Sequence, residues 1–174
     1  MLRFWLPIIF ILLSLSTQAQ TIWGAAAKGM SPAQVIEAVE LAHLVEDGGK
    51  APSGAVEMVR VDNVVIANES FKVSFFFTDQ KLVQVNLIMD TKNYSPATSD
   101  PNLIYSDIEA ALKVKYGKEI SSDKEASSIG RYMSASWVSD DKVMVTLFLD
   151  QIGDFAPRLG ITYRTQALTE SKNL

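Results

Sequence analysis

The sequence contains no cysteine among its 174 residues. Disulfide bonds, thiol nucleophiles, thiolate metal sites and lipid-modified cysteines are therefore excluded. A hydrophobic core alone must hold the fold together. A chain of this size buries about two thirds of the surface that it exposes when unfolded, which is enough for one domain with an ordinary core.

Histidine and basic runs are also scarce. His43 is the only histidine, and it has no neighbours at the spacing of a metal site or a catalytic triad. We expect it near the C-terminal end of a first helix, where partial positive charge is favourable; a role as general base or ligand is the alternative. The 16 basic residues are outnumbered by 20 acidic ones and form no run, which disfavours nucleic acid as a partner.

The acidic residues have no catalytic or metal-binding pattern. Four aspartates occupy turn-like segments of the second half: Asp140, Asp141, Asp150 and Asp154. Their spacing lacks the alternate oxygen ligands, central glycine and distal glutamate of a calcium loop, so we interpret them as solvated turn residues. Glu37 and Glu40 lie three residues apart, but acid–base work needs a cleft that the sequence does not indicate. We predict no catalytic residue, no metal and no cofactor.

The longest apolar run stands at the start of the chain. Arg3 precedes about a dozen apolar residues, Phe4–Leu15, and Thr17–Ala19 offers small residues for cleavage. A membrane-spanning helix needs about 20 such residues, so this run is too short. The pattern predicts a signal peptide, residues 1–19, and an exported chain of 155 residues with net charge −5 and no membrane span. An uncleaved anchor is the alternative.

The clearest strand pattern lies between residues 71 and 89. Apolar side chains recur at every second position on both sides of a polar break, which is typical of a hairpin with one buried face. The apolar set is Phe71, Val73, Phe75, Phe77, Val83, Val85, Leu87 and Met89.

The length of the hairpin loop follows from parity. A two-residue loop would place the amide side chains of the second strand, Gln84 and Asn86, on the face that carries the phenylalanines. A three-residue loop, Thr78–Gln80, keeps that face apolar and pairs Phe75 with Val83. The same register sets Phe76 opposite Leu82 on the outer face.

The segment Arg131–Leu149 repeats this logic. A three-residue loop, Ser139–Asp141, again gives one wholly apolar face. On the outer side this register sets Tyr132 opposite Phe148. A last strand follows near Leu159–Tyr163, whereas the serine-rich segment 120–129 is polar and is expected to be exposed.

Each hairpin is preceded by a helix-start signal. Ser31 as N-cap, Pro32 at the first helical position and Gln34 as the partner in a capping box predict a helix that continues to about Leu44. Two short strands, about 55–61 and 64–67, separate this helix from the first hairpin.

The second helix has clearer limits than the first. Asp100 and Pro101 repeat the start signal, and apolar residues at helical spacing continue to Tyr116. Gly117 follows where a left-handed C-terminal cap belongs.

These elements predict an α+β fold of two helix-plus-three-strand antiparallel units in tandem, with the helices packed on one face of the sheet. The units span residues 29–90 and 100–164 and are joined by the loop 90–100. We expect them to form a single exported domain, residues 20–174.

Three segments of the chain, Gly29–Val35, Phe75–Leu82 and Lys115–Lys118, resemble small bacterial envelope proteins of helix-plus-antiparallel-meander type. This group includes the tandem β-lactamase-inhibitory proteins and the small lipoprotein of the outer-membrane barrel assembly machinery. The resemblance implies binding to other proteins through the sheet surface and loops, without chemistry. The chain lacks the cysteines that staple the inhibitors and that carry the lipid of the lipoprotein.

The outward apolar side chains are the candidate binding residues. They are Phe76, Leu82, Tyr132 and Phe148. Large rigid side chains on a sheet can anchor a partner, although loops, the lead-in at Trp23 or a second copy of the chain could instead cover them. We predict a non-catalytic protein-binding module of the bacterial envelope, periplasmic or secreted, with an envelope or secreted protein as partner.

A second hypothesis is a small-ligand carrier or an enzyme with a cleft between the halves. In that case Trp23, His43 and the loop Asp47–Gly54 would converge at the cleft.

Overall fold

The computed structural model describes residues 20–92, 94–95, 99–127, 129–153 and 155–165. The predicted signal peptide, the C-terminal tail, Asp154 and part of the 90–100 loop lie outside these ranges. The described elements are the helices α1 (Pro32–Ala38) and α2 (Pro101–Tyr116), a small hairpin of β1 (Thr21–Trp23) and β2 (Ala26–Ala27), and one large sheet. Among the described helices, none is long and apolar enough to cross a membrane.

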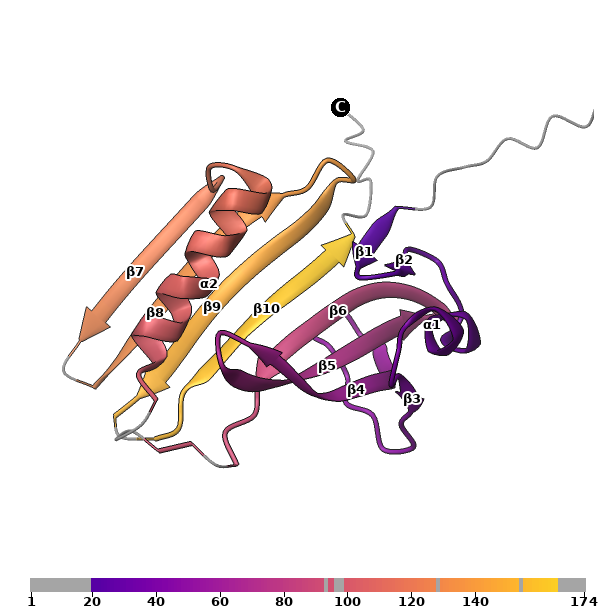
Figure 1. Cartoon of the computed structure of the whole chain (residues 1–174), viewed down its shortest axis with the longest axis horizontal. Helices are drawn as coiled ribbons and strands as arrows, with labels where there is room; N and C mark the ends of the chain where they lie inside the picture. Colours follow the sequence, from indigo (N-terminus) through magenta and orange to yellow (C-terminus); the bar gives the residue numbers. More distant parts are fainter. Residues whose placement is uncertain (1–19, 93, 96–98, 128, 154, 166–174) are drawn as a thin grey trace, which may run out of the picture.

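The large sheet has eight antiparallel strands (Figure 1). Their spatial order is β3 (His43–Leu44), β4 (Val56–Ile66), β5 (Glu69–Thr78), β6 (Lys81–Met89), β10 (Arg158–Thr165), β9 (Val143–Ile152), β8 (Gly130–Val138) and β7 (Ser121–Ser127). The last strand of the described residues, β10, therefore lies in the middle, between β6 and β9.

The predicted fold class is wrong. Strand dominates the described residues, both helices are short, and the strands form one continuous sheet instead of two helix-plus-three-strand units in tandem. The pairing of Ile161 with both Leu87 and Leu147 joins the two halves of the chain through β10. Each half contributes four strands, because the exposed segment 120–129 contains β7 and the end of the first predicted helix contains β3.

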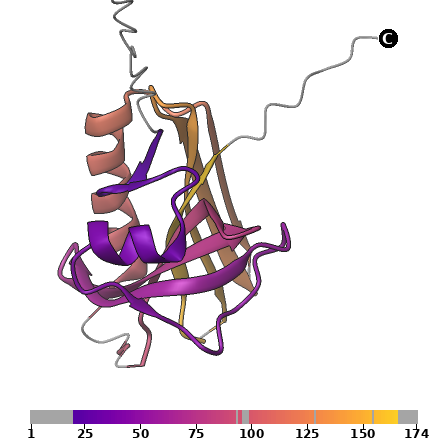
Figure 2. The ribbon, with the colours of Figure 1, turned by 90° about the vertical axis from the view of Figure 1, so that its right-hand side faces the viewer.

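A single core lies between the sheet and the two helices. Val35 of α1 and Ile108 of α2 belong to the same buried cluster as Phe75 of β5 and Leu147 of β9. Helix α2 lies along β8 and β9, and the turned view shows it on one side of the sheet (Figure 2). Helix α1 packs against β4, β3 and β2 at the other end.

The first hairpin is confirmed, but its loop is shorter than predicted. The loop contains two residues, Asp79 and Gln80, with φ angles of 48° and 62°. Positive φ at both central positions is the geometry of tight hairpins that follow the twist of the strands. The three-residue loop is therefore wrong.

A β-bulge between Phe76 and Phe77 resolves the parity conflict that excluded the short loop. Phe77 pairs with Leu82 next to the turn, whereas beyond the bulge Phe75 pairs with Val85. One extra residue on β6 thus returns its apolar side chains to the core face and keeps the side-chain amides of Gln84 and Asn86 on the outer face.

The second hairpin has the predicted loop length at a different position. The Ser139 amide donates to the Val143 carbonyl (3.0 Å), so the three loop residues are Asp140–Lys142. Lys142 takes the left-handed conformation, with φ 56°. The predicted loop, Ser139–Asp141, is one residue too early.

Helix α2 begins and ends where the sequence predicted. The Asp100 carboxylate accepts a hydrogen bond from the Asn102 amide (2.9 Å), Pro101 takes the first helical position, and Gly117 ends the helix with φ 80°.

Helix α1 has the predicted start but stops early. Ser31 and Gln34 form the capping box. The helix ends at Ala38, after which His43 pairs with Arg60 in the short strand β3. The expected position of His43 near a helix end is therefore wrong, because strand pairing with β4 takes precedence over helix continuation.

Candidate functional site

The face of the sheet that points away from the helices, here called the outer face, carries three of the four predicted binding residues. Leu82 is the exception: it is fully buried in the main core, because it pairs with Phe77 and not with Phe76. Phe76 does lie on the outer face, but it packs under the loop before β4, against Ala51 and Ala55. Only 7% of Phe76 remains exposed, so the chain itself covers this residue.

A buried carboxylate fixes that loop to the sheet. Glu57 of β4 accepts hydrogen bonds from the Arg60 guanidinium (2.8 Å) and the Gly49 amide (3.2 Å), while its own amide donates to the Gly49 carbonyl (2.8 Å). Burial tends to raise the pKa of Glu57, but the bonds from Arg60, Ser74 and Gly49 outweigh it and lower the pKa below its usual value.

Phe148 and Tyr132 lie on the second half of the outer face, where the loop does not reach. They do not face each other: Tyr132 lies opposite Asp150, and Phe148 lies opposite Ser134 and Gly160. Tyr132 is 42% exposed and Phe148 is partly buried. The prediction that both point outward is confirmed, but the predicted pairing of Tyr132 with Phe148 is wrong.

Gly160 and Arg158 shape the surroundings of Phe148. A Cβ atom at Gly160 would come within 2.7 Å of the Ile88 side chain and 3.0 Å of the Phe148 ring. The absence of a side chain there leaves room for both apolar groups. The Arg158 guanidinium lies 5.2 Å from the centre of the Phe148 ring, within cation–π range.

Sequence reasoning missed an apolar cluster next to Tyr132. Ile129, Ile152 and Phe155 are large, exposed side chains, Phe155 to 77%. Ile129, Tyr132 and Ile152 border one surface hollow. The Gly153 amide donates to the Ile129 carbonyl (2.9 Å), which joins the two turns, and the Phe155 amide donates to the Ile152 carbonyl (3.2 Å) within the second turn. We call Ile129, Tyr132, Ile152 and Phe155 the corner patch. Its members come from two strands and the turns beside them, so no single periodic pattern indicates it.

Strand β7 continues this surface to the edge of the sheet (Figure 1). All seven of its side chains are exposed. Lys124 forms an ion pair with Glu109 of α2 (3.5 Å), whereas Asp123 and Glu125 form none with any other described residue. An open edge of this kind presents unpaired backbone groups that can take up a further strand.

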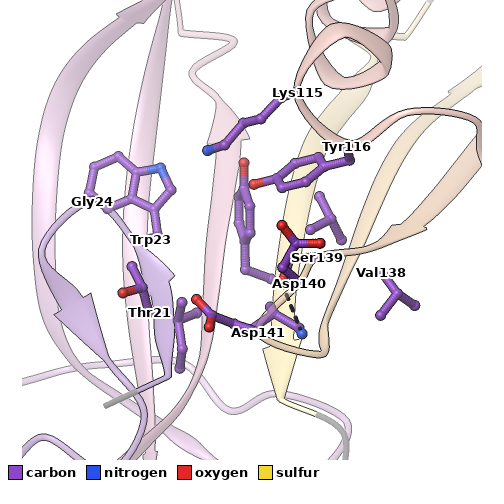
Figure 3. Close-up of a pocket in the computed structure, with 13 residues that line it drawn as sticks. Thr21, Trp23, Gly24, Lys115, Tyr116, Val138, Ser139, Asp140 and Asp141 are labelled. Atoms are coloured by element: carbon purple, nitrogen blue, oxygen red, sulfur yellow. Dashed lines mark hydrogen bonds between the residues drawn. The ribbon is translucent and has the colours of Figure 1, made fainter. Parts of the chain in front are cut away.

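A separate cavity of about 410 Å³ lies at the other end of β8 (Figure 3). Its walls come from β1 and the residue after it (Thr21–Gly24), the end of α2 (Lys115 and Tyr116), the β8–β9 turn (Val138–Asp141) and three buried residues, Val143, Val145 and Tyr163. Of the residues expected to converge at a cleft, Trp23 lines this cavity, whereas His43 and the loop Asp47–Gly54 do not.

His43 lies in β3, at the opposite edge of the sheet from β7. Its side chain is half exposed and its Nε2 atom is 3.5 Å from the Asp62 carboxylate. The loop Asp47–Gly54 lies on the outer face above Phe76. Neither contributes to the cavity at Trp23.

Tyr163 and Tyr116 form the polar back of the cavity. Tyr163 is almost fully buried and its hydroxyl interacts with that of Tyr116. Burial raises the pKa of Tyr163 far above its usual value, so the hydroxyl stays protonated. The Lys115 ammonium lies 5.0 Å from the centre of the Tyr116 ring.

No group of three or more metal-ligating side chains comes together in the part of the chain that the structure describes. Asp140, Asp141 and Asp150 lie in a turn and a strand, and Asp154 is outside the described residues.

Comparison of the chain with protein-family models, with curated proteins and with solved structures finds no match.

Proposed function

We propose that the chain is an exported, non-catalytic protein-binding module of the bacterial cell envelope, periplasmic or secreted after removal of residues 1–19. The observation that carries this proposal is the asymmetry of the outer face. On the first half, the loop fixed by Glu57 buries Phe76, whereas on the second half Tyr132 is exposed and Phe148 is only partly buried. The corner patch and Phe148 are left accessible there.

The uncovered surface has the composition of a transient protein interface. Such interfaces combine aromatic and aliphatic anchors with a polar surround. Tyr132 and Phe155 supply the anchors, and Ser136 and Thr146, joined by a 3.1 Å hydrogen bond, belong to the polar surround. Exposed apolar groups gathered in one place indicate an interaction site, whereas scattered ones do not.

The test is capture of a partner from envelope extract of the native host. Tyr132→Ser combined with Phe155→Ser should leave folding intact, because both side chains are exposed, and should abolish capture. The matched control is Leu41→Ser with Val65→Ser, which removes two side chains that are at least 71% exposed and lie at the opposite end of the sheet. Equal loss with both pairs, or retention by the patch variant, would contradict the proposal.

A second candidate function is a small-ligand carrier. The cavity at Trp23 favours it, because aromatic, cationic and acidic groups line the same space.

A further inference from the structure

Unpaired charges of both signs line the cavity of Figure 3. Lys115 enters from the end of α2, and Asp140 and Asp141 come from the β8–β9 turn. None of these three side chains takes part in an ion pair with another described residue. A cation and two carboxylates thus border one space without neutralising each other.

Further hydrogen-bond donors gather on the Lys115 side of the cavity. The hydroxyl groups of Tyr116 and Tyr163 interact with each other beside the Lys115 ammonium. In Figure 3 the indole of Trp23 and the Lys115 ammonium face the same space. This side therefore offers a positive charge and hydroxyl groups, whereas the turn offers carboxylates.

The walls are fixed before any ligand arrives. The Gln20 side chain donates a hydrogen bond to the main-chain oxygen of Asp141, which links the N-terminal strand to the turn. The Ser139 hydroxyl accepts the Val143 amide (3.2 Å) and fixes the turn itself. Trp23 packs edge-on against Phe75 (5.9 Å between ring centres). A preformed site loses less entropy on binding.

We propose that this cavity binds a small zwitterion, namely a free amino acid or short peptide with an apolar side chain. The ligand carboxylate binds to Lys115 and the tyrosine hydroxyls, and the ligand ammonium binds to Asp140 and Asp141. The ligand side chain packs on Trp23. An anion alone would leave the two carboxylates unpaired and repelled, and a cation alone would be repelled by Lys115. The volume lies within the range of about 300–1,000 Å³ typical of ligand pockets.

This inference deepens the second candidate function and is independent of the corner patch. The experiment uses the mature protein and L-phenylalanine, with binding measured by calorimetry and by chemical-shift changes. N-acetyl-L-phenylalanine lacks the ammonium and L-phenylalaninamide lacks the carboxylate. Each should bind about tenfold more weakly or worse, since each loses a charge-assisted hydrogen bond.

Variants should reproduce these losses one group at a time. Lys115→Gln should lower the affinity for L-phenylalanine to that for L-phenylalaninamide and leave the affinity for the amide unchanged. Asp140→Asn with Asp141→Asn should lower the affinity for L-phenylalanine to that for N-acetyl-L-phenylalanine and leave the affinity for the N-acetyl derivative unchanged. Lys118→Gln, just beyond the end of α2 and outside the cavity lining, is the matched control and should leave all three affinities unchanged.

Three outcomes would overturn the proposal. They are no binding of L-phenylalanine or L-leucine at millimolar concentration, equal binding of the amino acid and either derivative, and equal effects of Lys115→Gln and Lys118→Gln. If Tyr132→Ser with Phe155→Ser leaves L-phenylalanine binding unchanged, the cavity and the corner patch are separate sites. The cavity proposal and the protein-binding proposal can then fail independently.

Discussion

At the scale of single residues, the outer face is divided by the few atoms that fix one loop. Glu57 is buried with three hydrogen-bond partners, and the Gly49 amide is one of them. A carboxylate held in this way contributes stability only while it is ionised. The stability of the loop over Phe76 therefore depends on pH, because both electrostatic and apolar contacts hold the loop in place.

Glu57→Gln should lower the free energy of unfolding by about 1–3 kcal/mol at neutral pH, since it weakens bonds to a buried charged group. The folded pKa of Glu57 lies below its usual 4.5, so this contribution is complete above the unfolded pKa and disappears as the pH falls through the folded value. Urea denaturation of both proteins at several pH values checks this. For Glu57→Gln, the difference in unfolding free energy from the unchanged protein should therefore shrink in acid. Glu125→Gln, on the exposed strand β7, should show no such pH-dependent difference.

Gly48 and Gly49 provide a matched pair at the same loop. A Cβ atom at Gly48 would lie 1.8 Å from the Glu57 carbonyl oxygen, whereas at Gly49 its nearest neighbour is a carboxylate oxygen at 3.8 Å. Gly48→Ala should displace the loop, expose Phe76 and speed amide exchange of residues 49–55. Gly49→Ala should change little. Equal exchange rates in the two variants would show that the loop does not lie as described.

At the scale of elements, the sequence predicted what local chemistry determines. Caps at Asp100 and Gly117 define α2, and period-2 alternation defines both hairpins. The bulge at Phe76 was not predictable, because it depends on how two strands meet. Strand β7 was missed because neither of its faces is buried, so no alternation marks it. The outward positions of Tyr132 and Phe148 followed from parity, but the corner patch also depends on how the turns at the ends of β8 and β9 meet.

The tight turn of the first hairpin gives an element-scale prediction. Asp79 and Gln80 both have positive φ, which costs most residues about 1–2 kcal/mol and glycine almost nothing. Asp79→Asn with Gln80→Gly should therefore raise the free energy of unfolding by about 1 kcal/mol, measured by chemical denaturation. Thr78→Gly, at the end of β5, should lower it, because glycine weakens a strand. Destabilisation by the Asn-Gly pair would contradict the two-residue loop.

At the scale of the whole molecule, the central pairing of β6 with β10 makes the halves interdependent. Val35 of α1 and Ile108 of α2 stand in the same core although they lie far apart in the sequence. A tandem of separate units would let one half unfold while the other persisted. A continuous sheet does not, because removing either half exposes the apolar face of the other.

Unfolding should accordingly occur in one cooperative step, with equal calorimetric and van't Hoff enthalpies. Val35→Ala and Ile108→Ala each leave a cavity in the core, so each should lower the midpoint of that same transition. Ile108→Ala should lower the free energy of unfolding by about 2–5 kcal/mol. Val114→Ala, on the exposed face of α2, is the control and should have little effect. If Val35→Ala shifted only one of two resolved transitions, the halves would be thermodynamically separate, and the bridging role of β10 would have to be abandoned.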